Sequence, residues 1–294
     1  LAVGARFDDR VIGNPKHFMS VERKIIHIDI DPSSISKRVK VDVPIVGDVK
    51  DVLNELIAML RESAQRPDEA ALGQWWNTIE GWRSRDCLSY DKSNTEVIKP
   101  QYVVETLWNM TKDGDTYITS DVGQHQMWAA QYLRHAKSRG FITSGGLGTM
   151  GFGYGAAIGA QMALGRDQRV VMFTGDGSFH MNLNEACTAV SYELPIITVI
   201  FNNSVLGMVR QWQTIFYEKR YSQTDPHRKT DFVKLAEGFG LKGYRCTNLP
   251  EFQAAFADAL KQKGPTWIEC IIDKDEKVLP MIPGGGDIND IIMK

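Results

Sequence analysis

The sequence predicts an α/β protein in which a doubly wound parallel sheet follows the end of a second α/β domain. Residues 170–174 and 196–201 are runs of strand length in which every residue except one threonine is apolar. Such runs are typical of parallel strands that are covered on both faces. Stretches of helical period separate the apolar runs, and strands that alternate with helices indicate a parallel sheet. Ligands of such sheets bind outside the carboxyl ends of the strands, so the candidate site residues are expected there.

The composition is that of an ordinary soluble globular chain. Of its 294 residues, 43% are hydrophobic and 24% are charged, which suits one large domain or two. A formal net charge of -2 argues against nucleic acid or an anionic membrane as a partner. The longest apolar stretch, residues 195–201, is too short to span a bilayer, and no signal peptide is visible. We therefore expect a cytoplasmic protein.

The cysteines and histidines are dispersed along the chain. No C-x-x-C pair occurs, which favours reduced, buried cysteines in a cytosolic protein. The histidines form no group with the spacing of metal ligands. The residues concerned are Cys87, Cys187, Cys246, Cys270, His17, His27, His125, His135, His180 and His227. Neither residue type predicts a disulfide framework or a metal centre.

Residues 1–62 read as the C-terminal part of an α/β domain. A strand is expected over 24–30, where β-branched residues precede an Asp-Pro pair that stops the ladder. A second extended piece covers 43–48. Asp48 is placed to cap a helix over 49–61, whose apolar side chains form one stripe.

The next segment, residues 63–99, reads as a helical connector. Residues 69–87 have helical period, and their apolar side chains are spaced to bury one face. These side chains are Leu72, Trp75, Trp76, Ile79 and Trp82. Core packing is the ordinary use of such a stripe, so we assign it no ligand.

Residues 100–277 form the second, larger domain. Its expected strands are 116–120, 141–143, 170–174, 196–201 and 266–272, and its expected helices are 102–110, 153–164, 232–240 and 251–262. A tail rich in Pro and Gly, residues 278–294, has no clear period and is expected to be a mobile flap or a frayed end. The chain begins at Leu1, in what reads as the end of a buried strand. We therefore expect the C-terminal part of a longer polypeptide.

Two polar residues stand just past the ends of the two apolar runs. Asp176 follows the first run and Asn203 follows the second. The interval between them leaves room for a turn, a crossover helix and one strand, and in a right-handed βαβ unit the two strands can be neighbours. Carboxylate and amide oxygens are hard ligands that suit Mg²⁺, and Val205 is placed to add a backbone carbonyl.

The surrounding glycines suit a diphosphate beside that metal. Gly175 and Gly177 let the backbone approach phosphates without a clashing side chain, and the helix that follows adds N–H groups and a positive dipole end. A purely local explanation is that Asp-Gly is a common turn and Asn-Asn a common strand end. The spacing and the βαβ context together favour the metal–diphosphate site.

These motifs resemble the cofactor motif of the thiamin diphosphate (ThDP) enzymes, in which Gly-Asp-Gly is followed by Asn-Asn. Three more segments, Gly-Gln-His-Gln-Met-Trp at 123–128, Gly-Gly-Leu-Gly-Thr-Met-Gly at 145–151 and Gly-Met-Val-Arg-Gln-Trp-Gln at 207–213, are similar to the acetohydroxyacid synthase (acetolactate synthase) catalytic large subunit. Residues 4–10 and 28–48 resemble the FAD-binding central domain of that family. The resemblance covers essentially the whole chain and implies the C-terminal portion of such a subunit.

The resemblance implies roles for individual residues. Asp176, Asn203 and the Val205 carbonyl would bind Mg²⁺. Gln124 and His125 would approach the diphosphate, and the other cofactor-binding residues would be Gly148, Gly175, Gly177 and Ser178. Met150 would be the large residue wedged beneath ThDP and, with Gln124, is our catalytic candidate. Met181, Val209 and Trp212 would line the substrate pocket, and the best FAD positions are Arg6, Asp29 and Asp48.

Several of these residues have a simpler explanation. Met150 and Trp212 are ordinary core residues by type, and a lone histidine such as His125 is usually structural. Asp29 can instead cap a strand end and Asp48 a helix. The family commonly has Leu-Pro where this chain has Tyr154-Gly155, so the start of the local helix is uncertain from sequence.

The resemblance implies ThDP- and Mg²⁺-dependent decarboxylation of pyruvate and condensation with pyruvate or 2-ketobutyrate. The products would be acetolactate or acetohydroxybutyrate in the biosynthesis of valine, leucine and isoleucine. FAD would be structural, and this chain would hold only part of its site. The family's catalytic glutamate lies in an N-terminal domain outside this chain and comes from a neighbouring subunit. The resemblance thus implies a homodimer or larger oligomer, a small regulatory subunit, and a fragment that is inactive alone.

Other functions are weighed against this one. Pyruvate oxidase and glyoxylate carboligase share the architecture, but the stretch at 208–212 favours acetohydroxyacid synthase. A non-catalytic binding or assembly chain is a different class, and the intact pair of Asp176 and Asn203 argues against it. A simple dinucleotide-binding domain lacks support because no strand-linked G-x-G-x-x-G precedes a suitably spaced acidic residue.

Overall fold

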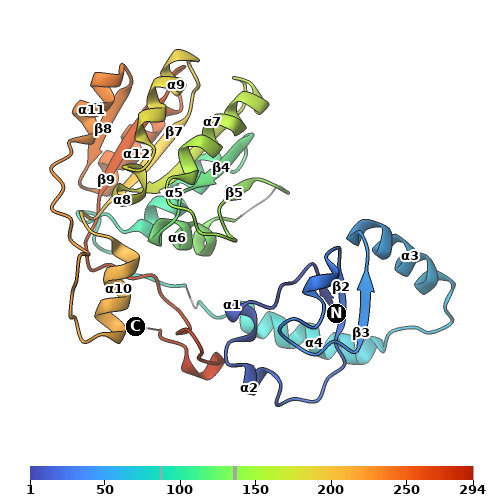
Figure 1. Cartoon of the computed structure of the whole chain (residues 1–294). Coiled ribbons are helices and arrows are strands. Elements are labelled where there is room, and N and C mark those ends of the chain that lie inside the picture. Colours follow the sequence, from blue (N-terminus) through green and yellow to red (C-terminus); the bar gives the residue numbers. More distant parts are fainter. Residues whose placement is uncertain (87, 135–137, 294) are drawn as a thin grey trace. The chain divides into compact units, whose positions relative to one another are not determined.

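The computed structural model describes residues 1–86, 88–134 and 138–293, and the chain forms two compact units (Figure 1). One unit comprises Leu1–Cys87 and Leu279–Lys294, and the other comprises Leu88–Val278. The predicted connector is thus divided between the units, and the predicted tail is grouped with the first. The finer division into four parts stays a prediction.

The smaller unit contains a parallel sheet of three short strands in the order β1-β2-β3, which are Ala2–Val3, Ile26–Asp29 and Val43–Val46. A small core of Phe7, Ile25 and Val39 lies beside it. Its helices are α1 Asp9–Ile12, α2 Pro15–Phe18, η1 Pro32–Ser34, α3 Val49–Glu62, α4 Glu69–Arg83 and η3 Ile288–Asp290. The strands and the long helix predicted for residues 1–62 are therefore present, with shorter strands than expected.

Helix α4 forms where its period predicts, but its aromatic face is not buried. Trp75, Trp76 and Trp82 are each 53% exposed. The rings of Trp75 and Trp82 contact each other edge to face with centroids 5.5 Å apart. The expectation of a buried face was wrong, because periodicity fixes which side chains share a face but does not supply an element to cover it.

The tail is held to the smaller unit. Met281 and Ile292 pair through two antiparallel backbone hydrogen bonds. Arg10 Nη1 donates to the carbonyl of Ile282 at 3.0 Å, and His17 Nδ1 lies 2.6 Å from Asp287 Oδ2. These contacts are not those of a frayed end, and the alternative of a mobile flap stays a prediction.

The larger unit is built on a six-stranded sheet in the order β5-β4-β6-β7-β9-β8, and every neighbouring pair is parallel. The strands are β4 Thr116–Ser120, β5 Phe141–Thr143, β6 Arg169–Gly175, β7 Ile197–Asn202, β8 Lys242–Cys246 and β9 Thr266–Ile271. This arrangement confirms the predicted α/β class with a doubly wound parallel sheet.

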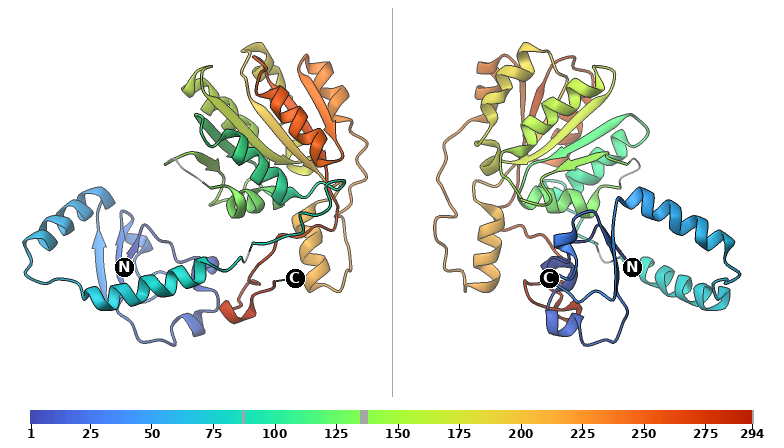
Figure 2. Two further views of the ribbon diagram at one scale, coloured as in Figure 1. Left: turned by 180° about the vertical axis from the view of Figure 1, so that it is seen from behind. Right: turned by 45° about the vertical axis from the view of Figure 1, so that its right-hand side comes forward.

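Helices cover both faces of this sheet (Figure 2). Val171 and Phe173 of β6 pack with α5, α6 and α12 in one core, whereas Val170 and Met172 pack with α7, α9 and α11 in the other. The helices are α5 Pro100–Thr111, α6 Gln124–Tyr132, α7 Phe152–Leu164, α8 Asp176–Phe179, η2 Leu183–Glu185, α9 Ala186–Ser191, α10 Gly207–Phe216, α11 Phe232–Phe239 and α12 Leu249–Ala259. Within the described residues, none of the helices is both long and apolar enough to cross a bilayer.

The cysteines depart in part from their predicted environment. Cys246 and Cys270 are buried, and burial raises the pKa of the Cys246 thiol to about 12. Cys187 is exposed, so the prediction that it is buried was wrong. Its place on the short helix α9 turns it away from the core that Ala186 and Ala189 enter. Cys87 and His135 lie outside the described residues.

Candidate functional site

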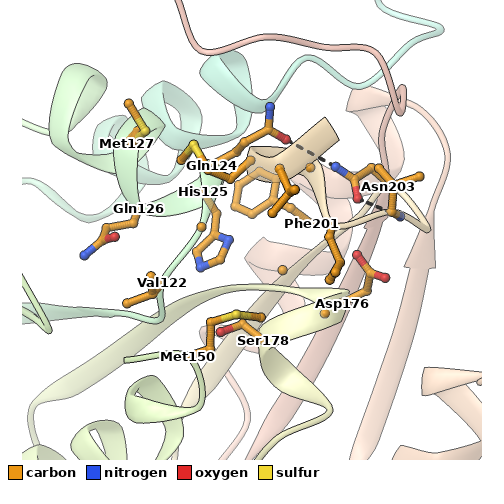
Figure 3. Close-up of a pocket in the computed structure, with 18 of the residues that line it drawn as sticks. Val122, Gln124, His125, Gln126, Met127, Met150, Asp176, Ser178, Phe201 and Asn203 are labelled. Atoms are coloured by element: carbon orange, nitrogen blue, oxygen red, sulfur yellow. Dashed lines mark hydrogen bonds between the residues drawn. The ribbon is translucent and has the colours of Figure 1, made fainter. Parts of the chain in front are cut away.

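A cavity of about 310 Å³ lies at the carboxyl ends of the central strands β6 and β7 of the larger unit (Figure 3). It is lined by the starts of α6 and α10, by the Gly-Asp-Gly turn after β6 and by Met150. Residues that line it include Gln124, His125, Gly148, Asp176, Ser178 and Asn203. The cavity therefore lies at the edge of the sheet where the sequence predicts the site.

Asp176 and Asn203 converge at this edge because β6 and β7 are neighbours, with Gly175 opposite Phe201. The backbone N–H of Asn203 donates to the Asp176 carboxylate. The Asn203 side chain accepts from the Val205 N–H at 3.1 Å and donates to Gln124 Oε1 at 3.3 Å (Figure 3). The three predicted metal-binding residues thus belong to one hydrogen-bonded cluster.

Asp176 is a buried carboxylate, and desolvation by burial raises its pKa to about 6. Arg228, whose Nη1 lies 3.5 Å from Asp176 Oδ2, opposes this rise, as do backbone N–H groups. Among the residues that the structure describes, no three or more His, Cys, Asp or Glu side chains are grouped so that they could hold a metal ion by themselves. A cation here would complete its shell with amide, carbonyl, phosphate and water oxygens, which is the ligand set of Mg²⁺.

The glycines and His125 form one wall of the cavity. A Cβ at Gly175 would lie 3.0 Å from His125 Nδ1, and a Cβ at Gly177 would lie 3.0 Å from the Leu206 side chain. His125 is buried, and its Nε2 has no hydrogen-bond partner within the described chain. Desolvation lowers the pKa of His125 to about 4, so the imidazole is neutral. The wall therefore offers close backbone approach and one unpaired ring nitrogen.

Met150 lies in the glycine-rich turn, whose end is fixed by hydrogen bonds. The Gly151 N–H donates to Asp121 Oδ1 at 2.8 Å and to Ser178 Oγ at 3.3 Å. Gly151 has a φ of 89°, a left-handed conformation that suits glycine, and α7 starts at the next residue. The local helix start, uncertain from sequence, is thus determined by this glycine cap.

The candidate substrate residues are only partly brought together. Val209 lines the cavity, but Met181 and Trp212 are not among the lining residues. Trp212 lies further along α10, where its ring packs against Phe216 with centroids 5.2 Å apart. Met181 is exposed and lies next to the Gly151 turn.

The three candidate FAD residues all lie in the smaller unit and each has a local contact. Arg6 Nε donates to Asp8 Oδ2 at 3.0 Å. Asp29 accepts from the Asp31 N–H at 2.9 Å, and Asp48 caps α3 by accepting from the Lys50 N–H at 2.8 Å. These contacts match the capping alternatives for Asp29 and Asp48 and leave an FAD role as a proposal.

Two residues that the sequence does not single out contact side chains that line the cavity. Gln211 accepts from Gln124 Nε2 at 2.8 Å, and it also binds the Val278 backbone with 2.9 Å and 3.1 Å contacts. Arg228 comes from the loop between α10 and α11. The helical period of α10 would have found Gln211 on its inner face, whereas no local signal points to Arg228.

Comparisons with known proteins place these features in a family. The C-terminal TPP binding domain of the thiamine pyrophosphate enzymes matches residues 121–270, and their central domain matches residues 1–56. Thiamine pyrophosphate is another name for ThDP. The match to residues 121–270 contains most of the strands of the larger sheet and the whole Asp176–Asn203 cluster.

Individual relatives match the chain from end to end. It is 49% identical to the acetolactate synthase isozyme 3 large subunit of Escherichia coli (strain K12) over 97% of the chain and 50% of the relative. It is 42% identical to the acetolactate synthase large subunit of Haemophilus influenzae over 100% of the chain and 50% of the relative. For the acetolactate synthase large subunit IlvB1 of Mycobacterium tuberculosis, identity is 44% over 99% of the chain and 47% of the relative. The chain spans about half the length of these curated relatives.

Proposed function

Given that the chain belongs to the thiamine pyrophosphate enzymes, we propose that it supplies the diphosphate- and metal-binding half of an acetolactate synthase active site. The main observation in support of this proposal is that Asp176 and Asn203 lie together at adjacent strand ends beside a cavity. The similarity to acetolactate synthase large subunits favours this activity over that of pyruvate oxidase or glyoxylate carboligase. An intact site favours an enzyme over a purely structural chain.

Asp176, Asn203 and the carbonyl of Val205 are proposed to hold Mg²⁺. The buried carboxylate carries a negative charge that a cation would compensate. The amide of Asn203 is already oriented by Gln124 and by the Val205 N–H. Removing the negative ligand is expected to cost more than removing either neutral one.

The diphosphate is proposed to lie along the glycine wall. When bound, ThDP supplies a thiazolium that accepts electrons during decarboxylation of a 2-keto acid. Gly148, Gly175, Gly177 and Ser178 would line the cofactor, and the free Nε2 of the neutral His125 would accept one hydrogen bond. Met150 would support the rings from below and Gln124 would orient the metal cluster.

Substrates and partners follow from the relatives and are part of the same proposal. The substrates would be pyruvate and a second 2-keto acid, pyruvate or 2-ketobutyrate. Val209 would contact them from the cavity wall, and Met181 and Trp212 would do so from its rim. Arg6, Asp29 and Asp48 would contact a structural FAD. The assembly would be a cytoplasmic homodimer or larger oligomer that binds a small regulatory subunit.

Asp176→Ala tests the metal assignment in the polypeptide that carries this chain. We expect Mg²⁺-dependent ThDP affinity to fall by at least about tenfold, because a charge-assisted ligand is lost. Calorimetric titration of ThDP at several Mg²⁺ concentrations measures this loss. The exposed Asp167→Ala is the matched control and should bind as the wild type does. Unchanged affinity in Asp176→Ala would remove Asp176 from the site, and mass spectrometry of products from pyruvate would test the activity itself.

A further inference from the structure

Arg228 extends from the loop between α10 and α11 to the carboxylate of Asp176. Its Nη1 lies 3.5 Å from Asp176 Oδ2, and the two side chains are 26% and 5% exposed. The same nitrogen lies 3.6 Å from the position that a Cβ at Gly177 would take. The guanidinium therefore sits where the metal site meets solvent.

The backbone on both sides of Arg228 is anchored. Before it, the carbonyl of the buried Thr224 accepts from the Leu206 N–H at 2.8 Å. After it, Thr230 Oγ1 lies 2.7 Å from His180 Nε2. These anchors keep the Arg228 side chain within reach of Asp176 while its exposed portion leaves room to rotate toward solvent. The ion pair can thus open without rearrangement of the loop.

A guanidinium and a metal ion compete for this carboxylate. A buried carboxylate without a counter-ion is unfavourable, so Arg228 stabilises Asp176 when no cation is present. Mg²⁺ binds oxygens at close range in a compact shell, and its two charges repel a guanidinium on the same carboxylate. Metal binding must therefore weaken or break the pair.

We propose that Arg228 is the counter-ion of Asp176 in the metal-free site and that Mg²⁺ displaces it, so that Arg228 sets the metal affinity. This inference rests on the proposed metal role of Asp176. In this role Arg228 would act differently from a residue that binds the diphosphate. A competitor weakens metal binding, whereas a phosphate ligand strengthens cofactor binding.

The test compares Arg228→Gln with Lys229→Gln in the polypeptide that carries this chain. Lys229 is the exposed neighbour, and its substitution removes the same charge from the same loop. The Mg²⁺ concentration for half-maximal ThDP binding is measured by calorimetry. It should fall about three- to tenfold in Arg228→Gln, as expected for one partly exposed charge pair, and stay unchanged in Lys229→Gln.

A second readout requires no cofactor. Without Mg²⁺ and ThDP, the Tm of Arg228→Gln should be lower than that of the wild type, and saturating Mg²⁺ and ThDP should remove the difference. An unchanged or higher Mg²⁺ requirement in Arg228→Gln overturns the inference, and weaker ThDP binding at saturating Mg²⁺ would make Arg228 a phosphate ligand instead. If the wild type shows no Mg²⁺ dependence at all, the proposed function itself fails, which is a distinct result.

Discussion

At the residue scale, His125 shows how burial fixes a protonation state. Desolvation outweighs the attraction of Asp121 and lowers the pKa of His125 to about 4, below the usual value of 6.5. The uncharged ring is therefore the form that the fold favours. The ring donates a hydrogen bond to the Asp121 backbone, so in the neutral form its unpaired nitrogen, Nε2, is a hydrogen-bond acceptor.

The depressed pKa of His125 has a consequence for stability. The neutral ring stabilises the fold fully above pH 6.5, and this contribution is lost as the pH falls toward 4. Between pH 7.5 and pH 5.0 the loss is about 2 kcal/mol at about 1.4 kcal/mol per pH unit. A glutamine side chain does not titrate. The free energy of unfolding of His125→Gln should therefore fall by about 2 kcal/mol less than that of the wild type between pH 7.5 and pH 5.0. Urea unfolding at both pH values measures the difference.

The comparison of variant with wild type removes the effect of other titrating groups. Asp176, whose pKa is about 6, gains stability on protonation in both proteins, so its contribution cancels. An equal pH dependence in His125→Gln and the wild type would show that His125 is not buried as a neutral ring.

At the element scale, the turn after β7 is shaped by a chain of polar contacts that begins on β9. Glu269, only 2% exposed, accepts from Asn202 Nδ2 at 2.7 Å and from Arg245 Nε at 2.7 Å. Asn202 Oδ1 in turn accepts from the Ser204 N–H at 3.0 Å, and Ser204 has a φ of 60°. The left-handed turn that presents Asn203 is thus held by a carboxylate on the neighbouring strand.

Glu269→Gln should loosen this turn. The glutamine amide retains the shape of Glu269 but lacks the negative charge that binds Arg245. Its NH₂ group is a hydrogen-bond donor and would face the donors Asn202 Nδ2 or Arg245 Nε. We expect the free energy of unfolding to fall by about 1–3 kcal/mol. Chemical denaturation measures this loss, with the exposed Glu237→Gln as the control. A loss no larger than that of Glu237→Gln would mean that Glu269 does not support the turn.

A strand or helix is easier to predict from the sequence when both of its faces, or one clear face, are buried. β6 and β7 are central, and their sheet is covered on both faces, so they read as apolar runs. β8 lies at the edge and contains Lys242, Gly243 and Arg245, so it has no apolar run to identify it as a strand. The sequence does not predict α6 as a helix because its glycine start and mixed polar residues weaken the helical period, whereas α10 has a clear helical period from which it could have been predicted.

Whether a site residue could be predicted from the sequence also depends on where it lies in the fold. Asp176 and Asn203 could be predicted because strand ends and βαβ handedness bring them together locally. Arg228 reaches Asp176 from a loop through its long side chain, which no residue pattern encodes, whereas the helical period of α10 would have placed Gln211 on its inner face. Trp212 lies on α10 against Phe216 and does not line the cavity, so its substrate role stays a proposal.

At the scale of the whole molecule, the proposed active site is expected to need groups beyond those that line the cavity. Among its described lining residues, Asp176 is the only carboxylate and His125 is the only imidazole. Asp176 is committed to the proposed metal, and a ring with a pKa of about 4 is a weak base at neutral pH. The cavity thus offers binding groups without a free carboxylate that could exchange a proton with the cofactor.

The chain of residues 1–294 should therefore make no acetolactate from pyruvate when given ThDP and Mg²⁺. The resemblance leads us to expect the required glutamate in an N-terminal domain of a neighbouring subunit, and the chain covers about half the length of its relatives. A polypeptide that also carries that domain should be active, and substitution of its glutamate by glutamine should reduce the rate by about 10²–10⁴-fold, the range for one acid–base group. Colorimetric detection of acetolactate measures both proteins. Product formation by residues 1–294 alone would show that a group within this chain exchanges the proton, and His125→Gln would then identify whether it is the imidazole.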